Sequence, residues 1–229
     1  MKTIGLIGGM SWESSAEYYR LINEEIKTKY GGLHSAKCIL YNVDFQEIER
    51  FQNEGKWEEA GQVLGDVALI LEKAGADFIV ICTNTMHKVI NVIEEKITIP
   101  ILHIADATAH QIQKSKLQSV GLIGTKYTME QDFYKNKLEA QGIKVIIPEK
   151  EEIEHINKVI FEELCLGKIK RKSKEYYKIV IENLIKRGAQ GIILGCTEVG
   201  LLIKPEDSTF PIFDTAKIHA IEAVNRAIK

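Results

Sequence analysis

One segment combines a helix end, a short strand and a turn into the next helix: Gly188-Ala189-Gln190-Gly191-Ile192-Ile193-Leu194-Gly195-Cys196-Thr197-Glu198. Its first glycine is typical of a helix C-terminus, and its apolar run is typical of a parallel strand buried on both faces. Cys196 follows that strand directly. The start of a following helix would favour its thiolate, whereas the nearby negative charge of Glu198 disfavours it. Cys196 is therefore a candidate catalytic residue.

A weaker copy of this segment lies earlier in the chain: Gly75-Ala76-Asp77-Phe78-Ile79-Val80-Ile81-Cys82-Thr83-Asn84-Thr85. Aligning the first glycines gives an offset of 113 residues, which places Thr83 opposite Cys196 (196 − 83 = 113). A second pair, Gly5-Leu6-Ile7-Gly8-Gly9 and Gly121-Leu122-Ile123-Gly124-Thr125, repeats at an offset of 116. Internal repeats of this kind predict two similar halves.

Apolar strand-like runs alternate with helical periodicity along the 229 residues. This alternation predicts parallel sheets covered by helices. We expect two similar parallel-sheet α/β domains related by pseudo-twofold symmetry, formed by residues 1–100 with 210–229 and by residues 101–209. Open α/β sheets bind ligands at the carboxyl ends of their strands. If the halves face each other, Thr83 and Cys196 converge on one active-site cleft between the domains.

The boundaries of the expected elements follow from apolar periodicity and from glycine and proline. Strands are expected over residues 4–7, 38–43, 78–82, 100–103, 120–123, 144–147, 191–194 and 211–213. Helices are expected over residues 13–29, 45–50, 57–73, 86–96, 108–116, 127–141, 153–166, 173–186 and 215–228.

Composition excludes several classes of function. The formal net charge of -2 gives no electrostatic reason to expect nucleic acid or an acidic membrane as partner. The four cysteines form no CxxC pair and have no histidine at metal-ligand spacing. Cysteines within apolar runs suggest reduced thiols and hence a cytoplasmic location. No apolar run reaches membrane-spanning length, and the N-terminal run is too short for a signal peptide.

Two nearby candidates have competing interpretations. Successive strand residues point to opposite faces, so Cys82 and Thr83 cannot both face a cleft. The repeat selects Thr83 and aligns Cys82 with a packing position. His87 is expected either to cap or solvate its helix or to shuttle a proton. The glycines at residues 5–9 lack the GxGxxG spacing of a dinucleotide loop, and a small anion at the following helix start fits them better.

Three motifs stand in register with those of a known family: Gly8-Gly9-Met10, Thr83-Asn84-Thr85-Met86-His87 and Gly195-Cys196-Thr197-Glu198. In these motifs the chain resembles the cofactor-independent aspartate/glutamate racemase family, over essentially its whole length. The resemblance implies an isomerase that needs neither pyridoxal phosphate nor a metal and that places one residue on each side of the substrate α-carbon. The Gly-Gly-Met start and Glu198 resemble the aspartate branch.

Two positions depart from the family pattern. The first of the two family cysteines is Thr83 here, as in a similar subgroup of racemases that act on L-aspartate and L-glutamate. The family's Glu-Val-Lys-x-Gly segment corresponds to residues 163–167, so Cys165 replaces a lysine that helps to bind a carboxylate. Gln52 is a candidate replacement for that lysine.

The resemblance assigns the catalytic roles to Cys196 and Thr83, with Cys196 deprotonating the L-isomer. A threonine hydroxyl is a far poorer base than a thiolate, so we expect the L-isomer to be preferred. The expected substrate-binding residues are Met10, Gln52, Asn84, Thr85, Thr128 and Thr197.

Two other classes of function stay open at this point. One is a maleate isomerase or decarboxylase-like enzyme of the same superfamily, and the other is a small-acid binding protein that has lost turnover. The expected ligands are L-aspartate and L-glutamate, and a homodimer is the expected assembly.

Overall fold

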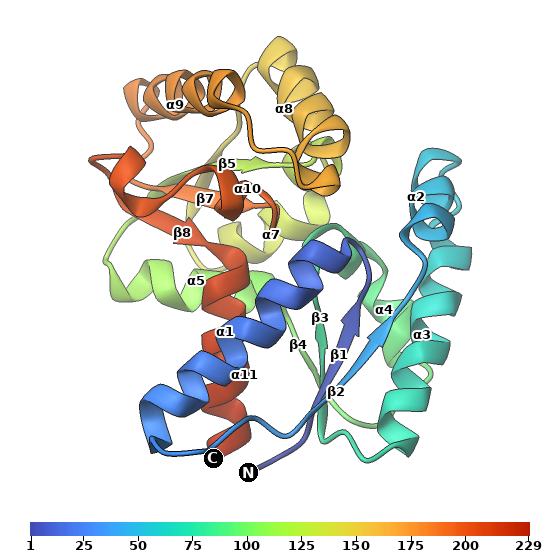
Figure 1. The fold of residues 1–229 in the computed structure, drawn as a ribbon. Coiled ribbons are helices and arrows are strands. Elements are labelled where there is room, and N and C mark those ends of the chain that lie inside the picture. Colours follow the sequence, from blue (N-terminus) through green and yellow to red (C-terminus); the bar gives the residue numbers. More distant parts are fainter. The chain divides into compact units, whose positions relative to one another are not determined.

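The structure, a computed structural model, describes residues 1–229. The chain forms two compact units, one of Met1–Ile104 with His219–Lys229 and the other of Ala105–Ile218. Each unit contains one four-stranded parallel sheet, in the order β2-β1-β3-β4 and in the order β6-β5-β7-β8 (Figure 1). The two sheets have the same strand order within their halves, which confirms the predicted duplication.

The first unit holds the elements of the first repeat. Its strands are β1 (Ile4–Gly8), β2 (Cys38–Asn42), β3 (Phe78–Ile81) and β4 (Ile101–Leu102). Its helices are α1 (Trp12–Tyr30), α2 (Phe45–Asn53), α3 (Trp57–Lys73), the 3-10 helix η1 (Thr85–Val89) and α4 (Ile90–Glu94). Ser11 caps α1 by accepting the N–H of Ser14 at 3.3 Å. Helix α3 ends before Gly75, whose φ of 97° suits glycine.

Helices cover both faces of the first sheet. Ile7, Ile79 and Ile81 belong to a buried cluster with Leu64 and Ala68 of α3. Side chains alternate along a strand, so Leu6 and Val80 point to the other face.

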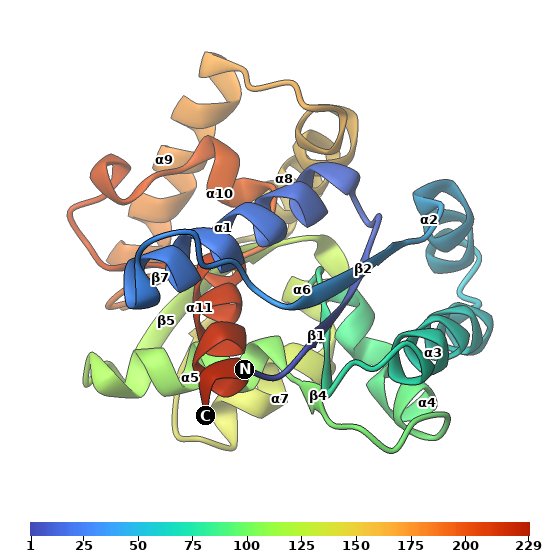
Figure 2. The ribbon, with the colours of Figure 1, turned by 60° about the horizontal axis from the view of Figure 1, so that its bottom comes forward.

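The other face of this sheet is covered by α1 and by the last part of α11 (Thr215–Ile228). These two helices lie side by side in Figures 1 and 2. Tyr18 of α1 contacts His219 of α11, and Arg226 lies over the ring of Phe78. The chain ends meet here, because the N–H of Lys2 donates to the carbonyl of Ala227 at 2.8 Å.

The second unit repeats this plan. Its strands are β5 (Ser119–Gly124), β6 (Lys144–Ile146), β7 (Ile192–Gly195) and β8 (Ile212–Asp214). Its helices are α5 (Ile104–Lys114), α6 (Lys126–Glu130), α7 (Asp132–Glu139), α8 (Lys150–Glu162), η2 (Leu164–Leu166), α9 (Arg171–Lys186), α10 (Val199–Leu202), η3 (Pro205–Asp207) and the start of α11. Thr125 caps α6 by accepting the N–H of Thr128 at 3.3 Å.

Helices pair on the two faces of the second sheet (Figure 1). On one face α8 and α9 are joined, because Asn183 donates to Glu152 at 2.8 Å. On the other face α5 and α7 are joined by the ion pair of Lys137 with Asp106 at 3.1 Å. Both sheets are therefore buried between helix layers, as their apolar strands require.

The domain boundaries and two helices differ from the sequence-based expectations. Residues 101–104 lie in the first unit, because β4 pairs with β3, and residues 210–218 lie in the second unit, because β8 pairs with β7. The helix expected over 86–96 is η1 followed by α4. The helix expected over 127–141 is broken at Gln131, whose extended backbone (φ -86°, ψ 154°) separates α6 from α7.

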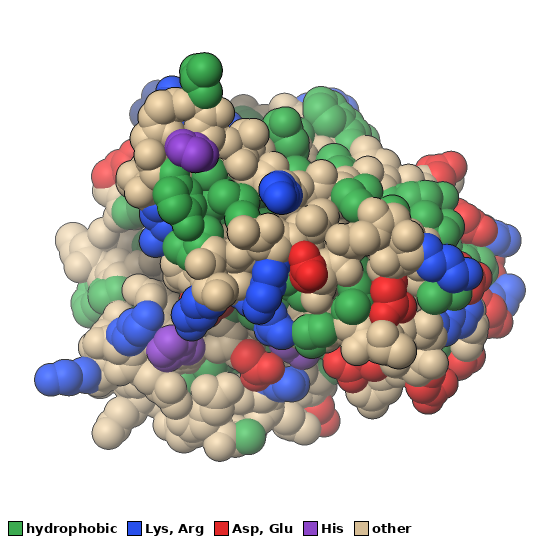
Figure 3. All heavy atoms as spheres, turned by 90° about the horizontal axis from the view of Figure 1, so that it is seen from below, with side chains coloured by type: hydrophobic (Ala, Val, Ile, Leu, Met, Phe, Trp, Pro, Cys, Tyr) green, Lys and Arg blue, Asp and Glu red, His purple; other side chains and the backbone are tan.

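The surface carries charges of both signs. In Figure 3, Lys and Arg side chains are interspersed with Asp and Glu side chains over the face that is shown. The nearly balanced composition, 30 basic and 32 acidic residues, agrees with this mixture. None of the helices combines the length and the apolar character that crossing a membrane requires.

Candidate functional site

The sheet registers identify which residues of the two halves correspond. The β1–β3 register, continued by one residue, places Gly8 beside Cys82. The β5–β7 register places Gly124 beside Gly195. Gly8 and Gly124 occupy the same position in the sequence repeat. Their neighbours Cys82 and Gly195 therefore correspond.

The next residues, Thr83 and Cys196, therefore also correspond, and each follows a central strand of its own sheet. Cys82 has no exposed surface, and burial raises the pKa of its thiol well above the ordinary value. Its position is that of a packing residue. The register thus agrees with the choice of Thr83 over Cys82 that was made from the repeat.

Cys196 lies against a buried carboxylate. Its thiol donates to Glu198 Oε2 at 3.0 Å, and the hydroxyl of Thr197 donates to the same oxygen at 2.8 Å. Cys196 and Glu198 are only 7% and 3% exposed. The thiol is therefore protonated, because a buried thiolate and a buried carboxylate at this distance would repel each other strongly.

The environment of Cys196 corrects one expectation. Burial, and then the charge of Glu198, raises the pKa of the Cys196 thiol well above its ordinary value. The helix that follows, α10, has only four residues and begins at Val199, so it offers little dipole to oppose this. A base made from Cys196 needs a group that accepts its proton, and the Glu198 carboxylate is the group in contact.

Two further side chains of the second unit lie near this thiol. Tyr177 of α9 is fully buried and donates to the carbonyl of Ile156 at 3.2 Å. Burial raises the pKa of Tyr177 well above its ordinary value, and an ionised Cys196 would raise it further. Cys165 is close enough for its charge to raise the pKa of Cys196 as well. Cys165, at which the resemblance leads one to expect a lysine, therefore lies near the thiol.

Thr83 is partly buried, and its main chain is held by His87. The carbonyl of Thr83 lies 2.9 Å from His87 Nδ1. The other ring nitrogen of His87, Nε2, accepts the N–H of Ile104 at 3.2 Å. The capping interpretation of His87 fits this arrangement, because both ring nitrogens bind main-chain groups.

The loop after β1 is tied to the same edge of the first sheet. The hydroxyl of Ser15 accepts the N–H of Gly9 at 2.7 Å, and the hydroxyl of Ser14 donates to the carbonyl of Cys82 at 3.0 Å. Met10, in this loop, is 3% exposed. Sequence reasoning missed both serines, although their spacing after the Ser11 cap places them on the first turn of α1, which faces the strand ends.

The other expected substrate-binding residues of the first unit are buried. Asn84 and Thr85 are 2% and 5% exposed, at the turn that leads into η1. Gln52, on α2, is 6% exposed, and its Nε2 donates to the sulfur of Met86 at 3.1 Å. Its amide therefore contacts the side chain of Met86, the second residue of η1.

The remaining expected residues, Thr128 and Thr197, have hydroxyls with partners inside the second unit. The hydroxyl of Thr128 lies 3.2 Å from that of Thr125, and Thr197 donates to Glu198 as described above. Thr128 lies in α6, the helix that follows β5, and Thr197 begins the turn after β7. The chain contains no group of three or more His, Cys, Asp or Glu side chains arranged to hold a metal ion.

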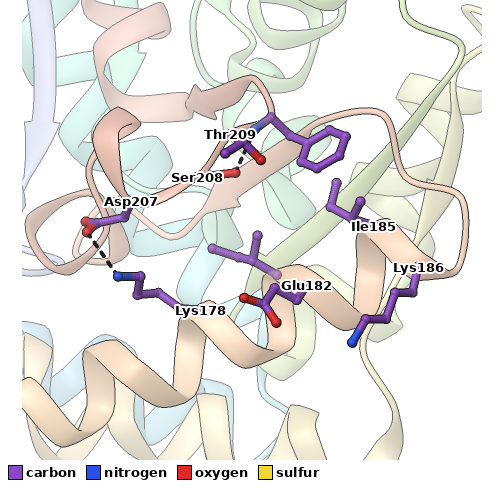
Figure 4. Close-up of a pocket in the computed structure, with 9 residues that line it drawn as sticks. Lys178, Glu182, Ile185, Lys186, Asp207, Ser208 and Thr209 are labelled. Carbon is purple, nitrogen blue, oxygen red and sulfur yellow. Dashed lines mark hydrogen bonds and ion pairs between the residues drawn. The ribbon is translucent and has the colours of Figure 1, made fainter.

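A surface pocket of about 280 Å³ lies elsewhere in the second unit. It lies between α9 and the loop that precedes β8 (Figure 4). Lys178 and Glu182 project from the helix, opposite Thr209 and Asp207, the last residue of η3, which forms an ion pair with Lys178 at 3.8 Å. The loop enters β8 at its amino end, whereas Cys196 follows the carboxyl end of β7. The pocket is therefore distinct from the Cys196 site.

Known proteins resemble the chain over its whole length. Residues 7–223 match the family described as Asp/Glu/hydantoin racemase. The broad specificity amino-acid racemase RacX of Bacillus subtilis (strain 168) is 22% identical over 230 residues, which cover 97% of this chain and 96% of that protein.

Two solved structures are similar in both sequence and fold. A candidate Asp/Glu racemase from Yersinia pestis is 53% identical with a TM-score of 0.92. An aspartate racemase homologue from Pyrococcus horikoshii OT3 is 39% identical with a TM-score of 0.87. Each comparison covers 100% of both chains. The duplicated sheets, the residues after their central strands and these likenesses agree: the chain belongs to the Asp/Glu/hydantoin racemase family, a family of isomerases.

Proposed function

We propose that this protein is a cofactor-independent racemase that inverts the α-carbon of aspartate, glutamate or both, with the L-isomer preferred. The observation that carries the proposal is the buried thiol of Cys196 in contact with Glu198, directly after the central strand β7. The matching position after β3 holds Thr83. The names of the similar proteins support the substrate class, since they describe an aspartate racemase homologue and an amino-acid racemase.

The first step is the activation of Cys196. The thiol proton moves along the existing hydrogen bond to Glu198 Oε2, which leaves a thiolate and a neutral carboxylic acid. This transfer moves the negative charge from the Glu198 carboxylate to the Cys196 sulfur. It prepares the base without adding a charge to the buried site. The thiolate then removes the α-proton of the L-isomer and becomes a thiol again.

The second step delivers a proton to the opposite face. Thr83 is proposed to flank that face and to donate its hydroxyl proton to the carbanion. Solvent then returns a proton to the Thr83 oxygen, and the Glu198 carboxylic acid releases its proton to solvent, so that both residues regain their starting state. The negative charge that develops on the substrate carboxylate needs fixed donors in a water-poor site. Asn84, Thr85, Thr128 and Thr197 are the proposed contributors, together with main-chain N–H groups at the turns.

The preference for the L-isomer follows from the two bases. A threonine hydroxyl is far less acidic than a thiol, so Thr83 seldom presents the alkoxide that the D-isomer would require. The equilibrium constant between the isomers does not change, so a slow reaction from the D-isomer implies either slow net inversion or tight binding of the D-isomer. Gln52 and Met10 are proposed to contact the substrate, with Gln52 in place of the family lysine for the side-chain carboxylate.

The experiment is incubation of the enzyme with L-Asp, L-Glu and their D-isomers in D2O. Mass and chirality are read together at the α-carbon. We expect deuterium in the L-substrates, with slow appearance of the D-isomer. Absence of α-deuterium from all four amino acids would contradict the proposal.

A binding function is the second candidate, because Thr83 replaces a family cysteine. It predicts that L-aspartate raises the melting temperature of the protein without α-deuterium exchange. A panel of maleate and malonate-type acids, followed for isomerisation and CO2 release, tests the related reactions. We further propose that the protein is cytoplasmic and forms a homodimer. Measurement of its mass in solution tests the homodimer.

A further inference from the structure

We infer that His87 is a positioning residue that fixes the main chain of Thr83 through one defined, neutral tautomer of its ring. The inference rests on the proposed role of Thr83 in protonation. In this role the His87 ring touches neither the substrate nor the reacting atoms, but it determines where the Thr83 hydroxyl lies.

The hydrogen bonds of His87 define its tautomer. A main-chain N–H can only donate, so the N–H of Ile104, 3.2 Å from Nε2, requires a lone pair on that nitrogen. A carbonyl can only accept, so Nδ1, 2.9 Å from the Thr83 oxygen, must carry the proton. Both bonds together are possible only for the neutral ring with its proton on Nδ1.

The groups around His87 favour the same neutral state. The ring is 1% exposed and lies 4.6 Å from the ring of His103 and 5.8 Å from the ring of His219. His219 is also neutral, because burial lowers the pKa of its ring to about 3. Its Nε2 lies 2.8 Å from the carbonyl of Leu102 and donates to it, so Nδ1 of the neutral ring accepts the hydroxyl of Tyr18 at 2.9 Å. A charged His87 would point a second N–H at the N–H of Ile104, so that two donors would face each other in a buried site.

The two bonds join points that are distant in sequence. Thr83 leaves β3, while Ile104 begins α5 after β4, the neighbouring strand. The ring of His87 therefore holds the turn after β3 against the first residue of a helix. A proton shuttle would need a ring nitrogen exchanging with solvent, whereas here both nitrogens are held by main-chain groups.

Two substitutions separate the two bonds of the ring. His87→Asn keeps an N–H donor near the position of Nδ1, toward Thr83, and loses the acceptor for Ile104. His87→Gln keeps an acceptor near the position of Nε2, toward Ile104, and loses the donor for Thr83. His34→Gln, at an exposed histidine of the same unit, is the matched control.

The assay compares two rates in D2O with L-aspartate. Exchange with retention reports Cys196 alone, whereas inversion also needs Thr83. We expect His87→Gln to lower inversion by about 100-fold, the effect of a misplaced catalytic group, with exchange under retention changed by less than about threefold. His87→Asn should keep inversion within about tenfold of the native rate. In a Thr83→Ala background, His87→Gln should change inversion by less than about twofold.

Equal losses of inversion and retention, or equal effects of the two variants, would overturn the positioning role. An activity-independent readout is 15N NMR of the histidine rings at pH 7. We expect a protonated Nδ1 and a bare Nε2 in His87, and a Thr83 amide shift that changes in His87→Gln more than in His87→Asn. If the native protein exchanges no α-proton, the proposed function fails, and the NMR result alone decides the inference: a protonated Nε2 or a cationic ring refutes it.

Discussion

Acid should destabilise the first unit through His219, whose ring lies between Tyr18 and Leu102 with no exposed surface. Burial lowers the pKa of His219 from 6.5 to about 3. The folded protein therefore keeps this ring neutral in mild acid, whereas the unfolded chain binds a proton below pH 6.5. The stability that His219 contributes is complete above that pH and is lost as the pH falls toward 3.

The size of the effect follows from these two pKa values. Each pKa unit corresponds to about 1.4 kcal/mol. At pH 5 the unfolded chain is almost fully protonated at His219 and the folded chain is not. We therefore expect His219 to remove about 2 kcal/mol of unfolding free energy between pH 7 and pH 5.

The assay is chemical unfolding at pH 7 and pH 5, followed by tryptophan fluorescence. Both tryptophans, Trp12 and Trp57, lie in the first unit, so the signal reports that unit. His219→Gln keeps a donor for the carbonyl of Leu102 but cannot bind a proton. The variant should lose about 2 kcal/mol less than the native protein over this pH range, while His34→Gln should behave like the native protein. An equal pH dependence in native protein and His219→Gln would refute the reasoning.

Three other predictions concern the second unit and the proposed bases. Glu198→Gln should slow α-deuterium exchange into L-aspartate by at least about 100-fold, since the acceptor of the Cys196 proton is lost; unchanged exchange would argue against that step. Thr83→Cys should raise the rate on D-aspartate, and no gain in a folded variant would count against the assigned role. Gly124→Ala should destabilise the protein by about 1–3 kcal/mol, because the added Cβ would lie 2.7 Å from the carbonyl oxygen of Gly195; an unchanged melting temperature would show that the strands can move apart.

Most of the fold was predictable, because short sequence patterns determine its strands and helix ends. Buried parallel strands show as apolar runs such as Phe78–Ile81, and helix ends show as glycines such as Gly75 and Gly188, which adopt φ values of 97° and 102°. The repeat then required equal sheets. The domain boundary near residue 210 was harder to predict. It depends on the pairing of β8 with β7, which the local sequence does not reveal.

The correspondence of the two candidate residues was predictable from the sequence, whereas their side-chain contacts were not. The offset of 113 residues identified Thr83 and Cys196, and the sheet registers give the same correspondence. The side-chain partners depend on packing: Glu198 could be noted as a nearby charge, but its hydrogen bond to the thiol could not. Tyr177 reaches the region of Cys196 from α9, and no periodic signal in the sequence distinguishes it from other buried positions.

The most direct test of the central claim compares serine substitutions at two buried cysteines. Cys196 is the proposed base, and Cys82 corresponds in the repeat to Gly195, the residue before it. Cys196→Ser and Cys82→Ser are incubated with L-aspartate in D2O, after circular dichroism has shown that both are folded. We predict no α-deuterium with Cys196→Ser and near-native incorporation with Cys82→Ser. Incorporation that survives in Cys196→Ser, or that disappears only in Cys82→Ser, would contradict the assignment of Cys196 as the base.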